Sequence, residues 1–250
     1  RSREYIRRVL RALGHSPLIF TNIDEFMALG RGATRLDLLV LGDAPDTDSQ
    51  GRAVIASALD TIGPKVPMLH APMHKRTRPL RQRGGAGDRV AASPRFFSDL
   101  FSVVLSFLDS HGFAATPRLL VWGRYAFHPV ERIVAFNDEE LKLDAVDFDV
   151  ALELFFNAGR PIAGRWLTRM LPAGESGANW HRIDNLACTV DELRVALELD
   201  GSNGWILEAL PADGYRLSSV PQPAALPFVA SAAEGLAAKR RGALAVPELE

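Results

Sequence analysis

The amino-acid sequence predicts two domains, a doubly wound α/β domain followed by an α+β domain. In the first half, short apolar runs alternate with amphipathic helical patterns, which is typical of right-handed βαβ units around a parallel sheet. In the second half, three helical patterns precede a hairpin pattern. The length of 250 residues also favours two domains, because single cores rarely grow much beyond that size.

The elements of the first half begin with a helix whose apolar residues recur from Tyr5 to Leu13 and which ends at Gly14. The continuous apolar run at 38–41 indicates a strand that is buried on both faces of a parallel sheet. The last helix has an apolar face between Phe97 and Leu108. Between them the sequence predicts strands at 18–20, 66–69 and 89–91, and helices at 24–29 and 52–61.

The second half is expected to open with two short strands, at 121–127 and 132–134. A helix at 148–155 with Gly159 as its C-cap, a short helix at 163–170 and the polar loop AGESGANWH lead to a third helix. The buried stripe of the third helix is predicted to be Ile183, Leu186, Ala187, Val190, Leu193 and Leu197. The segment GWILEALPADGYRL has the pattern of a β-hairpin. Three helices followed by a hairpin is the order of a winged-helix domain.

Pro117 and a change of charge mark the boundary between the domains. Residues 1–119 carry 17 Lys/Arg against 11 Asp/Glu, whereas residues 120–220 carry 9 against 16. In chain order, the sequence predicts a first domain at 1–112, a linker at 113–119, a second domain at 120–220 and an Ala/Pro-rich tail at 221–250. Opposite charges favour attraction between the two domains. The basic stretch at 74–87 is expected to dock on the acidic half within the chain or across a dimer, and the alternative is that it binds nucleic acid or an acidic partner.

The composition places the protein in a broad class. A content of 47% hydrophobic and 24% charged residues is typical of a soluble globular chain. A single cysteine excludes an internal disulfide framework and fits the reducing cytoplasm. No apolar run reaches the roughly 20 residues that cross a bilayer, so no membrane association is expected. Because the chain opens with Arg1 rather than Met, we expect that some N-terminal sequence precedes it.

Four stretches of the second half carry a family resemblance: LLVWGRYAFHPVERIV, LKLDAVDFDVALELFFNAGRPIAGRWL, DELRVAL and GYRL. With the alternating first half, they resemble response regulators of the OmpR/PhoB type, two-component proteins in which a receiver domain precedes a winged-helix effector domain. In that family the stretches are the platform sheet, the first two helices, the recognition helix and the wing. The resemblance implies a (βα)5 receiver-like domain, an α+β winged helix that binds DNA, and a homodimer formed through the receiver half around 94–110. The resemblance also implies that the protein regulates transcription.

The receiver-like half departs from this family at the positions that carry phosphoryl chemistry. The phosphate-accepting Asp of the family falls on Gly42, and Asp43 is one residue late, which turns a side chain to the other face of a strand. The switch Thr/Ser falls on Ala71 or Pro72, and the family's Lys-Pro corresponds to Ser93-Pro94. We therefore expect a phosphorylation-independent pseudo-receiver, with Asp43 as the alternative acceptor.

The effector half keeps few of the basic residues that the family uses on DNA. Residues 184–198 carry four acidic side chains against Arg194, and the wing's usual Arg falls on Pro211. Amide and hydroxyl groups can still read base edges without charge. The DNA-binding candidates are Arg165, Arg182, Asn185, Thr189, Arg194 and Arg216. The alternative is that the arginines are ordinary surface residues or partners within the domain.

Asn179, Trp180 and His181 fall where the family contacts RNA polymerase, and an exposed Trp there would be an interaction anchor. The alternative is a Trp packed on its own domain. His70 and His74 are four residues apart, but Pro72 between them disfavours one helical face and hence a metal site.

No other pattern indicates catalysis. The segments GRGATR and RGGAG lack the strand-loop-helix context and the Lys of a phosphate-binding loop. The sole cysteine, Cys188, is predicted to be a buried structural thiol. We therefore expect neither an enzyme nor a cofactor. Two functions remain open: a dimeric transcription regulator, or an adaptor whose acidic winged helix binds a protein.

Overall fold

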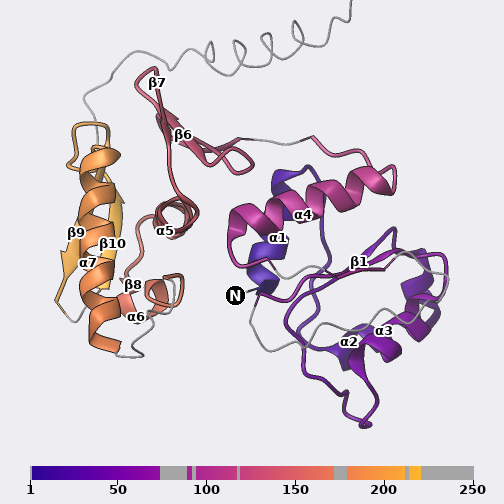
Figure 1. Ribbon diagram of the computed structural model, residues 1–250. Helices are drawn as coiled ribbons and strands as arrows, with labels where there is room; N and C mark the ends of the chain where they lie inside the picture. The colour runs from indigo at the N-terminus through magenta and orange to yellow at the C-terminus, as the bar shows by residue number, and fades with distance from the viewer. Residues whose placement is uncertain are drawn as a thin grey trace, which may run out of the picture. The chain divides into compact units, whose positions relative to one another are not determined.

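The computed structural model describes residues 2–73, 89–91, 94–116, 119–171, 179–211 and 214–220 (Figure 1). The side chains of 89–91 and 179–185 lie outside this description, as do the basic stretch at 74–87, Ser93 and the tail after Val220. No helix in the described ranges is both long and apolar enough to cross a membrane.

The chain divides into two compact units. Unit 1 consists of Arg1–Leu120, Phe127–Ile133 and Leu143–Val150, and unit 2 of Val121–Ala126, Val134–Lys142 and Ala151–Glu250. Both units mix helices with strands, so the protein has a mixed α/β fold. The linker at 113–119 stays a prediction from the sequence.

Unit 1 is built around three short parallel strands. In chain order its elements up to the linker are α1 (Ser2–Ala12), α2 (Ile23–Met27), the 3-10 helix η1 (Gly30–Arg35), β1 (Leu39–Leu41), α3 (Val54–Ile62), β2 (Met68–His70), β3 (Arg89–Ala91) and α4 (Phe97–Ser110). The strand order is β1-β2-β3, and both pairs are parallel. Figure 1 shows α1 and α4 together on one side of β1, and α2 and α3 on the other.

The helices on the two sides of this sheet bury separate apolar groups. On one side, the Tyr5 ring of α1 meets the edge of the Phe97 ring of α4, with centroids 5.4 Å apart. On the other, Phe26, Ala58 and Ile62 form a buried cluster with neighbouring residues of η1 and β2. Burial of these apolar surfaces is the main favourable contribution to the stability of unit 1.

The strand predicted at 18–20 is wrong. These residues belong to no helix or strand and pair with no strand in the described part of the chain, and Leu18 is 69% exposed. An apolar run becomes a strand only where a neighbour accepts its backbone hydrogen bonds. The strands expected at 38–41, 66–69 and 89–91 are present as β1, β2 and β3, with shifts of one or two residues at the ends of the first two.

The second half of the chain begins with a four-stranded sheet and ends with a hairpin. In chain order its elements are β4 (Leu120–Trp122), β5 (Tyr125–His128), β6 (Ile133–Phe136), β7 (Glu139–Lys142), α5 (Ala145–Phe156), β8 (Ile162–Ala163), α6 (Gly164–Leu167), α7 (Asn179–Ala196), β9 (Trp205–Leu210) and β10 (Gly214–Ser219). The first four strands lie side by side in sequence order, and β10 pairs with both β9 and β8. The predicted helices and hairpin are confirmed.

Aromatic rings hold the core of unit 2 together. The Phe155 ring lies 5.6 Å from that of Trp122, 5.1 Å from that of Tyr125 and 5.5 Å from that of Trp205. The Tyr125 hydroxyl donates to the Leu197 carbonyl at 2.6 Å. Burial raises the pKa of Tyr125 to about 12. This tyrosine therefore ties β5 to the end of α7.

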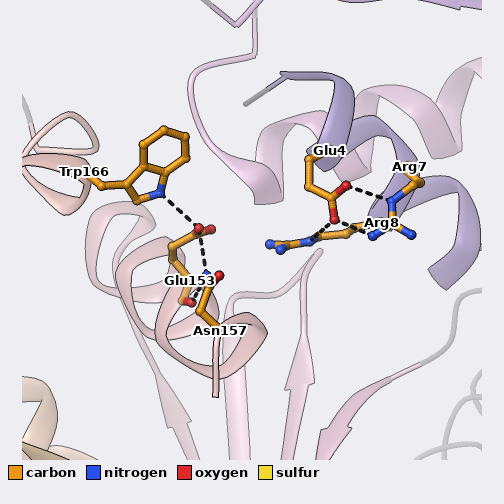
Figure 2. A network of polar contacts seen from close by, with 6 residues as sticks. All are labelled: Glu4, Arg7, Arg8, Glu153, Asn157 and Trp166. Atoms are coloured by element: carbon orange, nitrogen blue, oxygen red, sulfur yellow. Dashed lines mark hydrogen bonds and ion pairs between the residues drawn. The ribbon is translucent and has the colours of Figure 1, made fainter. Parts of the chain in front are cut away.

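A buried carboxylate joins α5 to α6. Figure 2 shows Glu153 accepting hydrogen bonds from the Trp166 indole and from the Asn157 amide, each at 3.0 Å. Glu153 is 4% exposed, so these donors replace the water that its charge would otherwise attract. In unit 1, Figure 2 also shows the Glu4 carboxylate between Arg7 and Arg8 of the same helix.

Gly214 permits the close approach of β8 to the hairpin. A Cβ atom at this position would lie 3.1 Å from the Ile162 carbonyl oxygen, which is tighter than side chains normally allow. The register pairs Gly214 with Ala163 and Tyr215 with Ile162. The three-stranded sheet β8-β10-β9 therefore depends on a residue without a side chain at this point.

Candidate functional site

The position expected for a phosphate acceptor has no room for a side chain. A Cβ atom at Gly42 would lie 2.9 Å from the Ser2 hydroxyl oxygen and 3.0 Å from the Ile6 Cδ1 atom, both on α1. Gly42 directly follows β1, where the carboxyl ends of parallel strands commonly form a site. Here α1 lies against that end of the strand.

Asp43 is held by the backbone around it. Its N–H donates to the Ser2 hydroxyl at 3.0 Å, and its carboxylate accepts the Met73 N–H at 3.0 Å. Nearby His70 is almost fully buried; burial lowers the pKa of its imidazole, and the Asp43 charge opposes that shift. Among the described residues, no cluster of three or more His, Cys, Asp or Glu side chains could hold a metal ion.

Asp48 orders the loop between β1 and α3. Its carboxylate accepts the Ser57 hydroxyl at 2.7 Å and the backbone N–H groups of Arg52 and Gln50 at 2.8 and 2.9 Å. These hydrogen bonds, that of Ser57 foremost, lower the pKa of Asp48 to about 2. This carboxylate is therefore structural and charged at neutral pH.

A groove of about 940 Å³ lies along β1 on its edge away from β2. The groove is lined by β1, by α1 and by the segment that follows α1. Its apolar side chains include Ile6, Leu10 and Phe20. The Arg3 guanidinium at the groove donates to the Thr21 carbonyl at 3.0 Å. This cation therefore holds the segment after α1 and is already engaged.

The outward face of α7 lacks positive charge in its described part. Leu186, Val190 and Leu193 are buried. The residues that face solvent are Ala187, Cys188, Asp191, Glu192, Val195 and Ala196, with Val195 78% exposed. The predicted burial of Ala187 and Cys188 is therefore wrong, because positions one and two residues after Leu186 turn away from the buried stripe.

Two of the predicted DNA-binding arginines form contacts within unit 2. Arg194 pairs with Asp191 at 2.7 Å and donates to the Leu207 carbonyl at 3.1 Å. Arg216 pairs across the hairpin with Glu208 at 2.9 Å. These contacts match the alternative interpretation of the two residues as partners within the domain.

Arg165 presents its guanidinium on α6. It is exposed and forms no ion pair with the described residues. Arg169 lies 5.7 Å from the centre of the Trp166 ring, in cation–π geometry. Thr189 is half-buried on α7. Among the candidate arginines whose side chains the structure describes, Arg165 is thus the one whose charge is most available to a ligand.

The remaining candidates lie at the start of α7. The helix begins at Asn179, so Trp180 and His181 belong to its first turn and not to the loop predicted for them. The side chains of these three residues, and those of Arg182 and Asn185, lie outside the described residues. Their roles stay predictions.

The contact between Asp149 and α4 was missed by reasoning from the sequence. Asp149 is 1% exposed, and its carboxylate accepts the N–H groups of Phe97 and, at 3.4 Å, Ser98. The one available hint was an acidic residue inside the apolar pattern of the α5 segment. Such a residue is buried only when it is paired or hydrogen-bonded.

Comparisons with known proteins give weak similarities. No family model and no curated protein matches the chain. Among solved structures, the response regulator DrrB, a Thermotoga maritima OmpR/PhoB homolog, is 16% identical with a TM-score of 0.34, covering 86% of this chain and 93% of that one. A streptococcal redox sensor described as evolved from two-component response regulators is 14% identical with a TM-score of 0.33, covering 87% and 94%. Neither similarity is strong enough to assign the chain to a family.

Proposed function

We propose that the protein is a cytoplasmic, response-regulator-like transcription regulator that binds DNA through unit 2 without phosphorylation of unit 1. The observation that carries this proposal is the arrangement of α6, α7 and the sheet β8-β10-β9. Two successive helices followed by a hairpin, with a short third strand before the first of them, is the element order of winged-helix domains, and this order supports the proposal. This type of fold commonly presents its second helix to the DNA major groove.

The packing at the end of β1 supports independence from phosphorylation. An aspartate at Gly42 would collide with Ser2 and Ile6, and the neighbouring Asp43 carboxylate is bonded to the Met73 N–H. In this proposal unit 1 is a pseudo-receiver of the doubly wound type that serves dimerisation and docking. A dimer holds two winged helices near one duplex, which raises avidity without new contacts.

The contacts with DNA are assigned to Arg165 and to the first half of α7. Arg194 and Arg216 already neutralise Asp191 and Glu208, so their charge is less available to phosphates. Thr189 and the candidates before it on α7 would supply polar groups to base edges. The proposed site therefore rests on few cations, and its affinity should depend modestly on salt.

The test is the salt dependence of binding to a fluorescent duplex from the region upstream of the protein's own gene. A regulator gives a negative slope of log K against log salt, and Arg165→Ala reduces the slope by about one. Arg35→Ala, at an exposed residue of η1 in unit 1, is the matched control and leaves the slope unchanged. Absence of binding at low salt would overturn the proposal.

A second candidate function is that of a protein adaptor. It is favoured by the acidic and apolar solvent-facing residues of α7, notably Glu192 and Val195, because exposed apolar residues on an interaction helix suit a protein partner. A photocrosslinker placed at Val195 in cells separates the two functions. An adaptor gives protein adducts there, RNA polymerase among the candidates, whereas a regulator gives DNA adducts.

A further inference from the structure

The first turn of α4 is bound by a carboxylate that lies about fifty residues further along the chain. The Phe97 and Ser98 N–H groups, which have no partner inside the helix, donate to Asp149 of α5. All three residues are buried, with Asp149 only 1% exposed. The Ser98 hydroxyl is buried without a partner among the described residues, so in this structure it is Asp149 that accepts from these amides.

This contact is sensitive to the charge of Asp149. A buried carboxylate is costly unless donors surround it, and the positive end of a helix dipole supplies both donors and favourable potential. Conversely, the two amides lose their acceptor if the carboxylate moves away. Loss of this contact would therefore leave buried polar groups unsatisfied on both sides.

One further contact attaches this part of the chain to α4, and two others join its segments to each other. Arg132 pairs with Asp99 in the first turn of α4 at 3.2 Å. The rings of Phe127 and Phe148 meet edge to face, with centroids 5.8 Å apart. The Leu143 N–H donates to the Arg132 carbonyl at 2.9 Å. The segments 127–133 and 143–150 are thus joined to each other and to α4 within unit 1.

The same turn of α4 is also in contact with α1. Phe97 packs against Tyr5. Ile6, the next residue of α1, and Ser2, one turn earlier, lie against Gly42 at the end of β1. A continuous series of packed residues therefore leads from the end of β1, through α1, to the first turn of α4 and Asp149. Energetic coupling between distant sites can pass through contiguous contacts of this kind. It is established by measuring whether a change at one site alters the other.

Helix α5 belongs to both units. Its residues up to Val150 are part of unit 1, whereas Ala151–Phe156 are part of unit 2. There Phe155 packs in the aromatic core and Glu153 binds Trp166 of α6. A disturbance of Asp149 would therefore reach the helix that supports α6.

We infer that Asp149 is a positioning residue that couples α4 to α5, so that changes at α1 and α4 in unit 1 alter the order of α5 and α6 in unit 2. One consequence of this inference rests on the proposed function: contacts within the protein, and not phosphorylation, would control DNA binding. The coupling itself is independent of what unit 2 binds.

The test is amide hydrogen exchange on the full chain, comparing wild type with Asp149→Asn. Loss of the charge should speed exchange about tenfold at 97–101 and also at 151–156, while α3 at 54–62 is unchanged. Asp109→Asn, an exposed residue at the other end of α4, is the matched control and changes neither segment. Unchanged exchange in Asp149→Asn, or faster exchange at 97–101 alone, would overturn the inference.

A milder variant protects the test against misfolding. Arg132→Gln removes the half-exposed ion pair with Asp99 and should give the same pattern with a smaller increase. If it speeds exchange at 97–101 and leaves 151–156 unchanged, the coupling is refuted. Duplex binding by wild type and the same variants is measured separately. Failure of wild type to bind DNA would refute the proposed function, whereas the exchange pattern alone tests the coupling.

Discussion

The Ser2 hydroxyl accepts the Asp43 N–H at 3.0 Å, and this contact brings the first turn of α1 against the end of β1. The same turn occupies the space that a side chain at Gly42 would need. Unit 1 therefore combines a parallel sheet with a closed position where an acceptor would be expected.

Gly42→Asp should destabilise the protein and should not create a phosphate acceptor. The new side chain overlaps the positions of Ser2 and Ile6, and overpacking of this kind costs about 1–3 kcal/mol. Denaturant unfolding measures the loss, and labelling with acetyl phosphate measures acceptor activity. Stable labelling of the wild-type protein that Asp43→Ala abolishes would contradict this part of the account.

Asp149→Ala should lower the free energy of unfolding by about 1–3 kcal/mol, because it leaves the buried Phe97 and Ser98 amides without an acceptor. Urea unfolding followed by circular dichroism measures the change. Asp109→Asn, at an exposed position, should stay within about 0.5 kcal/mol of wild type. Equal stability of the two variants would show that the Asp149 contact contributes nothing.

The fold of this protein was predictable where the signal is local. The apolar stripe of α7, the run at β1 and the turn composition of the hairpin each depend on neighbours within a few residues, and all three elements are present. The strand expected at 18–20 failed because a strand needs a partner, which local sequence does not specify.

The candidate site was less predictable, because its decisive contacts join distant residues. Asp149 and Phe97 are 52 residues apart, and no spacing rule connects them. Pairing of Arg194 with Asp191 follows a helical i, i+3 spacing and could have been anticipated. Ala187 was misplaced because the stripe was drawn one position too wide, and Cys188 because an unpaired thiol was expected to be buried.

The acid stability of unit 1 should depend on Asp48. Its pKa is about 2 in the folded protein, below the ordinary value of 3.8. Its contribution to stability is therefore present above the ordinary pKa and is lost as the pH falls toward 2. Ser57→Ala removes the largest cause of the shift, so acid unfolding should begin at higher pH in a circular dichroism titration. An unchanged acid midpoint would rule out this role.

Tyr125 should make unit 2 sensitive to alkali. Burial raises its pKa to about 12 from the ordinary 10.0, so the folded protein holds the phenol proton more tightly than the unfolded chain. The stabilisation is complete below pH 10 and is lost as the pH rises toward 12. Tyr125→Phe should remove this dependence and cost about 1–3 kcal/mol at neutral pH, since the buried Leu197 carbonyl loses its donor. Ultraviolet titration of the wild type, with Tyr125→Phe as the reference, gives the pKa directly.

DNA binding by unit 2 without phosphorylation of unit 1 is tested most directly by the duplex affinity of the full chain between about 50 and 200 mM salt, with and without acetyl phosphate. We expect a negative salt slope that is the same in both conditions and is reduced by Arg165→Ala. Absence of binding at low salt, or binding that appears only after acetyl phosphate treatment, would contradict it.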